Sequence, residues 1–161
     1  MRLQLSSLWQ GALASGVYQV ENDLWPDTLA TQTAAHQWRF FYLYGAAVFD
    51  KRTFLAACQT AFALPGYFGH NWDAFEETIN DFGWAPAAGY VLLYDRVANF
   101  AANRPTEWAV AEDILRATAS AWGRSGTPFY VLLKIGARGD TLPVCPSFHQ
   151  SADDGCLFTV A

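Results

Sequence analysis

Three short runs of apolar, strand-forming residues divide the chain, and the segments between them have helical periodicity. The runs are Trp38–Tyr44, Tyr90–Tyr94 and Phe129–Leu133. Each is apolar at nearly every position, which is typical of a strand buried on both faces of a parallel sheet. Gly16–Val20 alternates like a short edge strand, and Cys156–Val160 is interpreted as a last edge strand.

Two helices are predicted between each pair of runs. Asp50 caps a helix that continues to Phe62, and Asn71 caps a second that continues to Phe82. A short helix over 95–103 and a longer one over 105–123 follow the next run, while 28–35 is a linker or a weak helix. The order strand, two helices, strand, two helices, strand predicts an α/β fold with a small three-stranded parallel sheet.

The helix that begins after Asn71 has one apolar face and one acidic face. At about 100° per residue, the apolar face holds Trp72, Phe75, Ile79 and Phe82. The opposite face holds Asp73, Glu76, Glu77, Asn80 and Asp81. Like charges at these spacings repel each other, and no lysine or arginine in the helix compensates them. Two interpretations stay open: a solvated acidic face, or a docking surface for a cationic partner.

Composition narrows the class of partner. The 161 residues are 52% apolar and 16% aromatic, which indicates one globular domain with a proper core. Only 16% of the residues are charged, and the net charge is −5. Direct nucleic-acid binding needs a basic patch, and anionic membranes repel acidic proteins, so a basic protein partner is favoured.

The chain has no apolar run near the about 20 residues of a membrane helix and no visible secretory signal. Cys58 is expected to pack as a small apolar residue. Cys145 and Cys156 could pair, but a reduced, cytoplasmic state fits better. The segment 136–146 is predicted to be a loop.

The element order and one central string resemble the barstar-like family of intracellular ribonuclease inhibitors. The matching residues are Leu64-Pro65, Tyr67-Phe68-Gly69, Asn71, Asp73-Ala74 and Glu77. The resemblance covers roughly Arg39 to Lys134. It implies a single domain over 1–161 with a barstar-like three-layer arrangement, a core at 39–134, and extensions at 1–37 and 135–161 that can add edge strands.

In that family the loop and helix plug a ribonuclease active site, with carboxylates where substrate phosphates would lie. The resemblance therefore makes Asp73 and Glu77 the charged plug, and it makes Tyr67, Gly69 and Asn71 the residues that shape the loop. The rest of the expected contact surface is Trp72, Glu76 and Asp81. Trp72 is expected to pack first of all on the core. The expected partner is a basic ribonuclease. This chain itself is expected to be a monomer that has no cofactor, no metal and no catalytic residues.

Two positions depart from the inhibitor that gives the family its name. Glu77 stands where that protein has the shorter aspartate, and Glu76 stands where it has an aromatic residue. Both changes bear on which partner is bound more than on how it is bound.

Three alternatives remain. Asp73 and Glu77 with His70 could form an acid–base pair of a carboxylate-based hydrolase, but carboxyls one helical turn apart lie on a convex surface. Cys145, His149 and Cys156 could form half of a zinc site, although the paired ligand spacing is lacking. The third alternative is a barstar-like interaction module whose partner is not a ribonuclease.

Overall fold

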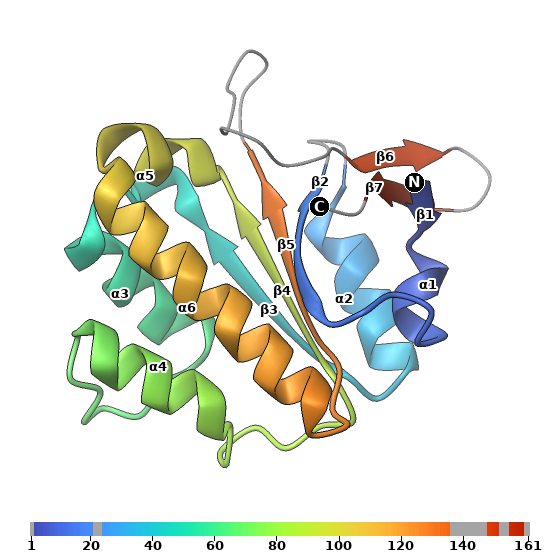
Figure 1. Cartoon of the computed structure of the whole chain (residues 1–161), viewed down its shortest axis with the longest axis horizontal. Coiled ribbons are helices and arrows are strands. Elements are labelled where there is room, and N and C mark those ends of the chain that lie inside the picture. Colours follow the sequence, from blue (N-terminus) through green and yellow to red (C-terminus); the bar gives the residue numbers. More distant parts are fainter. Residues whose placement is uncertain (1, 21–23, 136–147, 152–154, 160–161) are drawn as a thin grey trace.

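A four-stranded parallel sheet forms the centre of the molecule (Figure 1). The structure is a computed structural model that describes residues 2–20, 24–135, 148–151 and 155–159. The strands are β2 (Gly16–Val20), β3 (Arg39–Tyr44), β4 (Tyr90–Asp95) and β5 (Phe129–Lys134), in the order β2-β5-β4-β3. The predicted α/β class with a parallel sheet is confirmed, but three strands is wrong.

The fourth strand comes from the N-terminal extension. β2 pairs in parallel with β5, with Gly16 beside Tyr130 and Val20 beside Lys134. Without β2, the outer side of β5 would leave its backbone groups unpaired, and all six residues of β5 are buried. The sequence-predicted edge strand at Gly16–Val20 is therefore confirmed, and it converts β5 from an edge strand into a central one.

β3 is the other edge of the sheet. The prediction that this strand is buried on both faces is wrong. Phe41 and Leu43 are buried, whereas Arg39 and Tyr44 are exposed. β3 pairs only with β4 in this sheet, with Arg39 beside Tyr90. This apolar, aromatic-rich run therefore forms an edge strand, since aromatic side chains can pack on a face of a sheet that is only half buried.

Helices cover both faces of the sheet, which makes three layers. One face is covered by α3 (Lys51–Ala61), α4 (Trp72–Asp81) and α6 (Pro105–Arg124), with α5 (Val97–Asn103) at one end (Figure 1). The other face is covered by α1 (Ser6–Trp9) and α2 (Pro26–Ala35). The order from β3 to β5 is strand, two helices, strand, two helices, strand, as predicted, with the 3-10 turn η1 (Gly45–Ala47) after β3.

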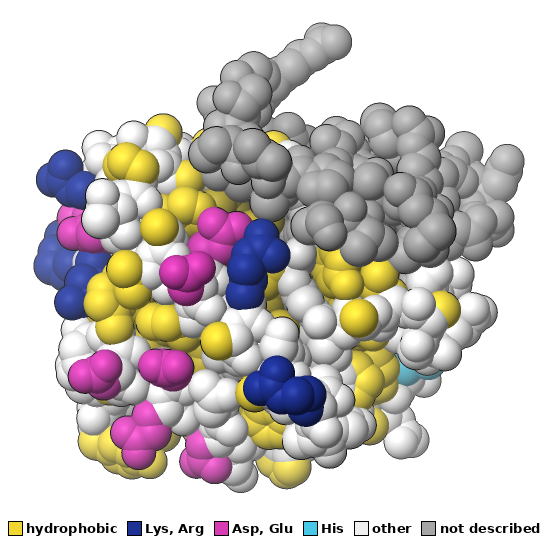
Figure 2. Space-filling view, viewed as in Figure 1, with side chains coloured by type: hydrophobic (Ala, Val, Ile, Leu, Met, Phe, Trp, Pro, Cys, Tyr) yellow, Lys and Arg dark blue, Asp and Glu magenta, His cyan; other side chains and the backbone are white. Residues whose placement is uncertain are grey.

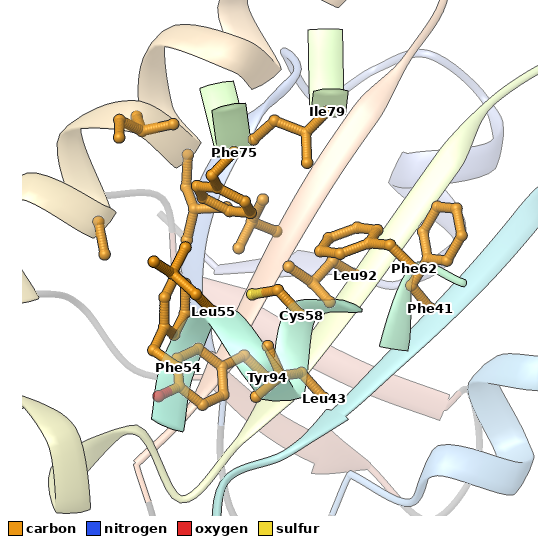
Figure 3. Packing of buried hydrophobic residues seen from close by; sticks show 14 of the residues in the cluster. Phe41, Leu43, Phe54, Leu55, Cys58, Phe62, Phe75, Ile79, Leu92 and Tyr94 are labelled. Carbon is orange, nitrogen blue, oxygen red and sulfur yellow. The ribbon is translucent and has the colours of Figure 1, made fainter. Parts of the chain in front are cut away.

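The larger hydrophobic core lies between the sheet and α3, α4 and α6 (Figure 3). Asp50 caps α3 as predicted, because its carboxylate accepts a hydrogen bond of 2.8 Å from Thr53 N. The apolar side chains of α3 then point into the core, and Cys58 is fully buried among them (Figure 3). Burial raises the pKa of the Cys58 thiol, so it packs as an apolar side chain, as predicted.

A second, antiparallel sheet joins the two extensions. It consists of β1 (Arg2–Gln4), β7 (Gly155–Thr159) and β6 (Phe148–Ser151), in the order β1-β7-β6. The predicted C-terminal strand is present, but it belongs to this sheet and not to the edge of the main one. The predicted loop at 136–146 and the side chains of Cys145, His149 and Cys156 lie outside what the structure describes.

Candidate functional site

The junction before α4 is fixed by Asn71. Its Oδ1 accepts a hydrogen bond of 2.8 Å from Ala74 N, which satisfies a free amide of the first helical turn. Its Nδ2 donates to Gly69 O at 3.0 Å, so the same side chain also holds the preceding loop. A Cβ on Gly69 would lie 3.1 Å from Asn71 Nδ2, so a larger residue there would crowd this contact. Asn71 and Gly69 therefore fix the shape of the loop before α4, and their contact with a partner stays a prediction.

The loop before the helix turns one aromatic side chain inward and the next one outward. Phe68 is buried, and its backbone N donates to Pro65 O at 2.9 Å in a tight turn. Tyr67 is 90% exposed, the largest exposure among the large apolar side chains described. Phe68 thus anchors the loop and leaves the ring of Tyr67 free to contact another molecule.

The acidic face of α4 points to solvent. Asp73, Glu76, Glu77 and Asp81 are all exposed, while Phe75 and Ile79 on the opposite face are fully buried. Among the residues that the structure describes, none of the four carboxylates forms an ion pair. Figure 2 shows acidic side chains gathered over α4 at the lower left. Their charge is therefore not compensated by a neighbouring helix.

A groove of about 360 Å³ runs between the aromatic loop and α4. Four of its lining residues belong to the predicted set: Tyr67, Gly69, Glu77 and Asp81. Carboxylates on one side and aromatic rings on the other are a chemical match for a guanidinium or ammonium group. The groove can therefore receive a cationic side chain.

Sequence reasoning missed Trp84, which also lines this groove. Its Nε1 donates to Phe62 O at 3.1 Å, and its ring packs edge-on against Phe82. These partners lie far from Trp84 in the chain or in a helix cap, so local periodicity carried no signal for its position.

The structure brings the other predicted residues near the groove without making them part of its lining. Asp73 and Glu76 are exposed on the helix outside it. Trp72 is half-buried, with its ring 5.9 Å from that of Phe54 and with Lys51 Nζ 5.4 Å from its ring centroid. Trp72 thus packs on the core, and contact with a partner remains a prediction for it.

α6 holds α4 in place from behind. Trp122 Nε1 donates to Ile79 O at 3.0 Å, and the Trp122 ring stacks on Phe82 at 5.6 Å. Asn80 Nδ2 donates to Thr118 Oγ1 at 3.3 Å. Phe82 ends the helix in the left-handed region with φ 46°. The carboxylates therefore project from a helix that is fastened at its far end.

Among the described residues, the side-chain hydrogen bond of His70 is with α3 and not with Asp73 or Glu77. His70 is exposed, and its Nε2 lies 2.8 Å from Gln59 Oε1, on the side of α3.

In the described part of the chain, no three His, Cys, Asp or Glu side chains gather so as to hold a metal ion. No helix among the described residues is long and apolar enough to cross a membrane.

Comparison with known proteins gives a family and a fold. The family model described as Barstar (barnase inhibitor) matches residues 38–134, which is more than half of the chain. No curated protein sequence matches the chain. Two solved structures of the ORC2 protein of Aeropyrum pernix, one in an ADP form and one with ADPNP–ADP complexes, are similar at TM-scores of 0.55 and 0.56.

Both ORC2 structures are 15% identical to this chain, so they show likeness of fold alone. The matches cover 82% and 83% of this chain, but only 38% of each ORC2 chain. The shared feature is thus the layered α/β arrangement.

Proposed function

The chain belongs to the barstar family, and we propose that it is a protein inhibitor that plugs the cationic active site of a ribonuclease. The plug is the loop–helix surface, meaning the exposed residues between Tyr67 and Asp81. The family is one of inhibitors, and the proposed role is accordingly binding without turnover. We place this role in the cytoplasm, in a monomer formed as a single domain, with a basic protein as the partner.

The exposed, unpaired carboxylates of α4 are the observation that carries this proposal. A ribonuclease presents preorganised cations that stabilise the charge of its transition state. Asp73 and Glu77 lie one helical turn apart on a helix that is fixed by Asn71 and Trp122. Such a pair can meet two of those cations without first breaking an ion pair of its own.

The groove adds the geometry of the proposed contact. Glu77 and Asp81 lie on its helix side, and Tyr67 extends from its loop side. In this arrangement a lysine or arginine of the ribonuclease enters the groove, Asp73 meets a second cation of the active site, and Glu76 contacts its rim. The acidic surface also speeds encounter with a basic enzyme by electrostatic steering.

The two departures at Glu76 and Glu77 favour a second candidate, an interaction module for another cationic protein. Glu77 is longer than aspartate by one methylene, and Glu76 adds a charge where an aromatic residue would stack. A partner for this surface needs more positive charge and less flat apolar area than a partner for an aromatic residue.

The test replaces the two central carboxylates. The Asp73→Ala, Glu77→Ala double variant should bind the host ribonuclease more weakly by about 2–5 kcal/mol per lost charge pair, with no loss of thermal stability. The enzyme would be isolated by affinity capture and its inhibition titrated at low and high salt. Salt should weaken the wild-type complex more than that of the variant.

The matched control is Asp27→Ala with Asp113→Ala, which removes the same charge from exposed positions on α2 and α6. It should leave inhibition close to the wild-type level. Inhibition by the Asp73, Glu77 variant at wild-type strength would reject the assigned surface. Capture of a cationic protein without ribonuclease activity would favour the second candidate.

A further inference from the structure

A second pocket lies on the other side of the start of α4, between the N-terminus of α3 and the junction of α5 with α6. Its volume is about 580 Å³. Its charged and titratable lining residues are Asp50, Lys51, Arg52, His70, Arg104 and Glu107. Three fixed cations and one histidine therefore meet in one cavity.

Both carboxylates of this pocket are occupied by hydrogen bonds from the backbone. Asp50 Oδ1 accepts from Thr53 N at 2.8 Å, and Glu107 Oε2 accepts from Lys51 N at 2.7 Å. These two acids cap the first turn of α3. The backbone amides thus use the best acceptor positions of both acids, which offset part of the positive charge without forming a short ion pair with a cation in the described ranges.

The cations form no short ion pair in the described ranges; hydrogen bonds from Thr53 hold the pKa of Asp50 below its ordinary value, and the charges of Arg52 and Arg104 lower it further from a longer distance. In the described ranges, Lys51, Arg52 and Arg104 form no ion pair, and the pair that is present there joins Arg116 to Glu112 at 2.9 Å. Arg52 and Arg104 are exposed, so their guanidinium groups can reach a ligand in the pocket. Lys51 is held with its ammonium over the Trp72 ring.

The pocket adjoins the acidic surface of α4. His70 lines the pocket and precedes Asn71, the N-cap of α4, while Lys51 contacts Trp72, the first residue of that helix. Figure 2 shows basic side chains gathered at the left edge of the molecule, directly above the acidic side chains over α4. One side of the molecule therefore presents two neighbouring patches of opposite sign.

We infer that this pocket receives a carboxylate-bearing segment of the same protein partner whose cations meet α4. This inference rests on the proposed function and adds a property of the partner: an acidic segment beside its cationic active site. Arg52 and Arg104 can each bind a carboxylate through paired N–H donors. Charge complementarity at both patches would fix the rotation of the partner about the plug.

The charge of the pocket favours a protein carboxylate over a polyanion such as a nucleotide. Lys51, Arg52 and Arg104 exceed Asp50 and Glu107 by a single positive charge. The carboxylates of α4 next to the pocket would repel a ligand of several negative charges. A single carboxylate on a largely neutral protein segment meets the guanidinium groups with less repulsion.

The first experiment needs no ribonuclease. Amide chemical shifts of the ¹⁵N-labelled protein would be followed at low salt during titration with an acidic peptide, N-acetyl-Asp-Gly-Ala amide. Shifts are expected at 50–56 and 104–107. The Arg52→Gln, Arg104→Gln double variant should weaken this binding by about tenfold, and Arg124→Gln, at the far end of α6, should not.

Three outcomes of this titration overturn the inference: no shifts at 50–56, equal shifts in the Arg52→Gln, Arg104→Gln variant, or a response to inorganic phosphate without one to the peptide. A basic peptide, N-acetyl-Arg-Gly-Ala amide, is the parallel probe for α4 and should shift residues 73–81. Its failure would count against the proposed function and not against the pocket.

The complex with the captured ribonuclease gives the second test. Arg104→Glu should weaken inhibition by about tenfold or more, and the far-end change Arg124→Glu should leave it unchanged. If Arg104→Glu has no effect while the Asp73, Glu77 variant loses inhibition, the inference fails and the proposed function stands.

Discussion

Gly89 precedes β4 at a point where the backbone passes directly beneath an indole ring. A Cβ on Gly89 would lie 2.4 Å from Trp38 Cδ2. Trp38 cannot turn aside freely, because its ring stacks on Tyr130 at 5.9 Å and meets Trp9 edge-on at 5.0 Å. The absence of a side chain at Gly89 is therefore what allows this aromatic group to pack next to the end of the sheet.

Gly89→Ala should lower the free energy of unfolding by about 1–3 kcal/mol, because the added methyl group forces the rings apart. Urea unfolding monitored by tryptophan fluorescence would measure the change. Gly66→Ala is the matched control, since a Cβ there meets no atom within 4 Å. Equal stabilities for the two variants would contradict the packing described for Trp38.

For single residues, the sequence predicts those whose roles depend on their near neighbours in the chain. Asn71 and Asp50 were identified as helix caps, because a cap is decided by the next three residues of the chain. The exposure of Asp73, Glu76, Glu77 and Asp81 also followed from helical spacing. Trp84 and Arg104 were missed, because each reaches its pocket through contacts with distant segments.

α4 is an element whose own sequence weakens it. Asp73 repels Glu76 and Glu77, and Glu77 repels Asp81, at the spacings where side chains are neighbours on a helix. Ten residues are also too few for a stable isolated helix. Its stability comes from Phe75 and Ile79 in the core and from Trp122 behind it. The surface that bears the charges thus depends on α6.

Trp122→Phe should loosen α4 and lower the free energy of unfolding by about 1 kcal/mol, because it removes the hydrogen bond to Ile79 O and keeps an aromatic ring. Hydrogen exchange at the amides of 76–82 should become faster. In Trp84→Phe, which loses the matching bond to Phe62 O, faster exchange should instead appear at the end of α3. Unchanged exchange in α4 of the Trp122 variant would show that other contacts hold the helix.

The type of each main element was predictable, and its neighbours in the sheet were not. β3, β4 and β5 had strong strand signals, but nothing in the apolar run of β3 marked it as an edge. β2 was recognised as a strand, yet its partner β5 lies more than a hundred residues away. Pairing over such a distance depends on the whole fold, so the sequence predicted three strands where four form.

The whole molecule is held together across its three layers by contacts through the sheet. Tyr130 on β5 faces the layer formed by the N-terminal segment, and its hydroxyl donates to Leu13 O at 2.6 Å. On the opposite face, Val131 and Leu133 of the same strand pack in the larger core. One strand therefore contributes to both cores and links the site-bearing layer to the extension.

Stability should fall as the pH rises from about 10 to about 12. Burial raises the pKa of Tyr130 to about 12, above its ordinary value of 10. The folded state therefore keeps the proton longer than the unfolded state, so this contribution is complete below pH 10 and is lost as the pH approaches 12. Denaturant unfolding at a series of pH values would measure the slope.

Tyr130→Phe should flatten that slope while lowering stability at neutral pH, because Leu13 O loses its donor. Tyr67→Phe removes a hydroxyl from an exposed ring and should keep the wild-type slope. An identical slope in Tyr130→Phe would assign the alkaline transition to other groups.

The pairing of β2 with β5 has a consequence for the order in which the molecule assembles during synthesis. The ribosome makes Leu5, Leu8 and Leu13 first, but the surface that covers them includes Tyr130 and Leu132 on the last strand of the main sheet. Until that strand emerges, the early leucines have no completed sheet to pack against, and the nascent chain must carry them exposed. The acidic face of α4 is likewise synthesised before α6, so its own support arrives late. A chain stalled before residue 105 would carry the acidic segment without the helix that fastens it.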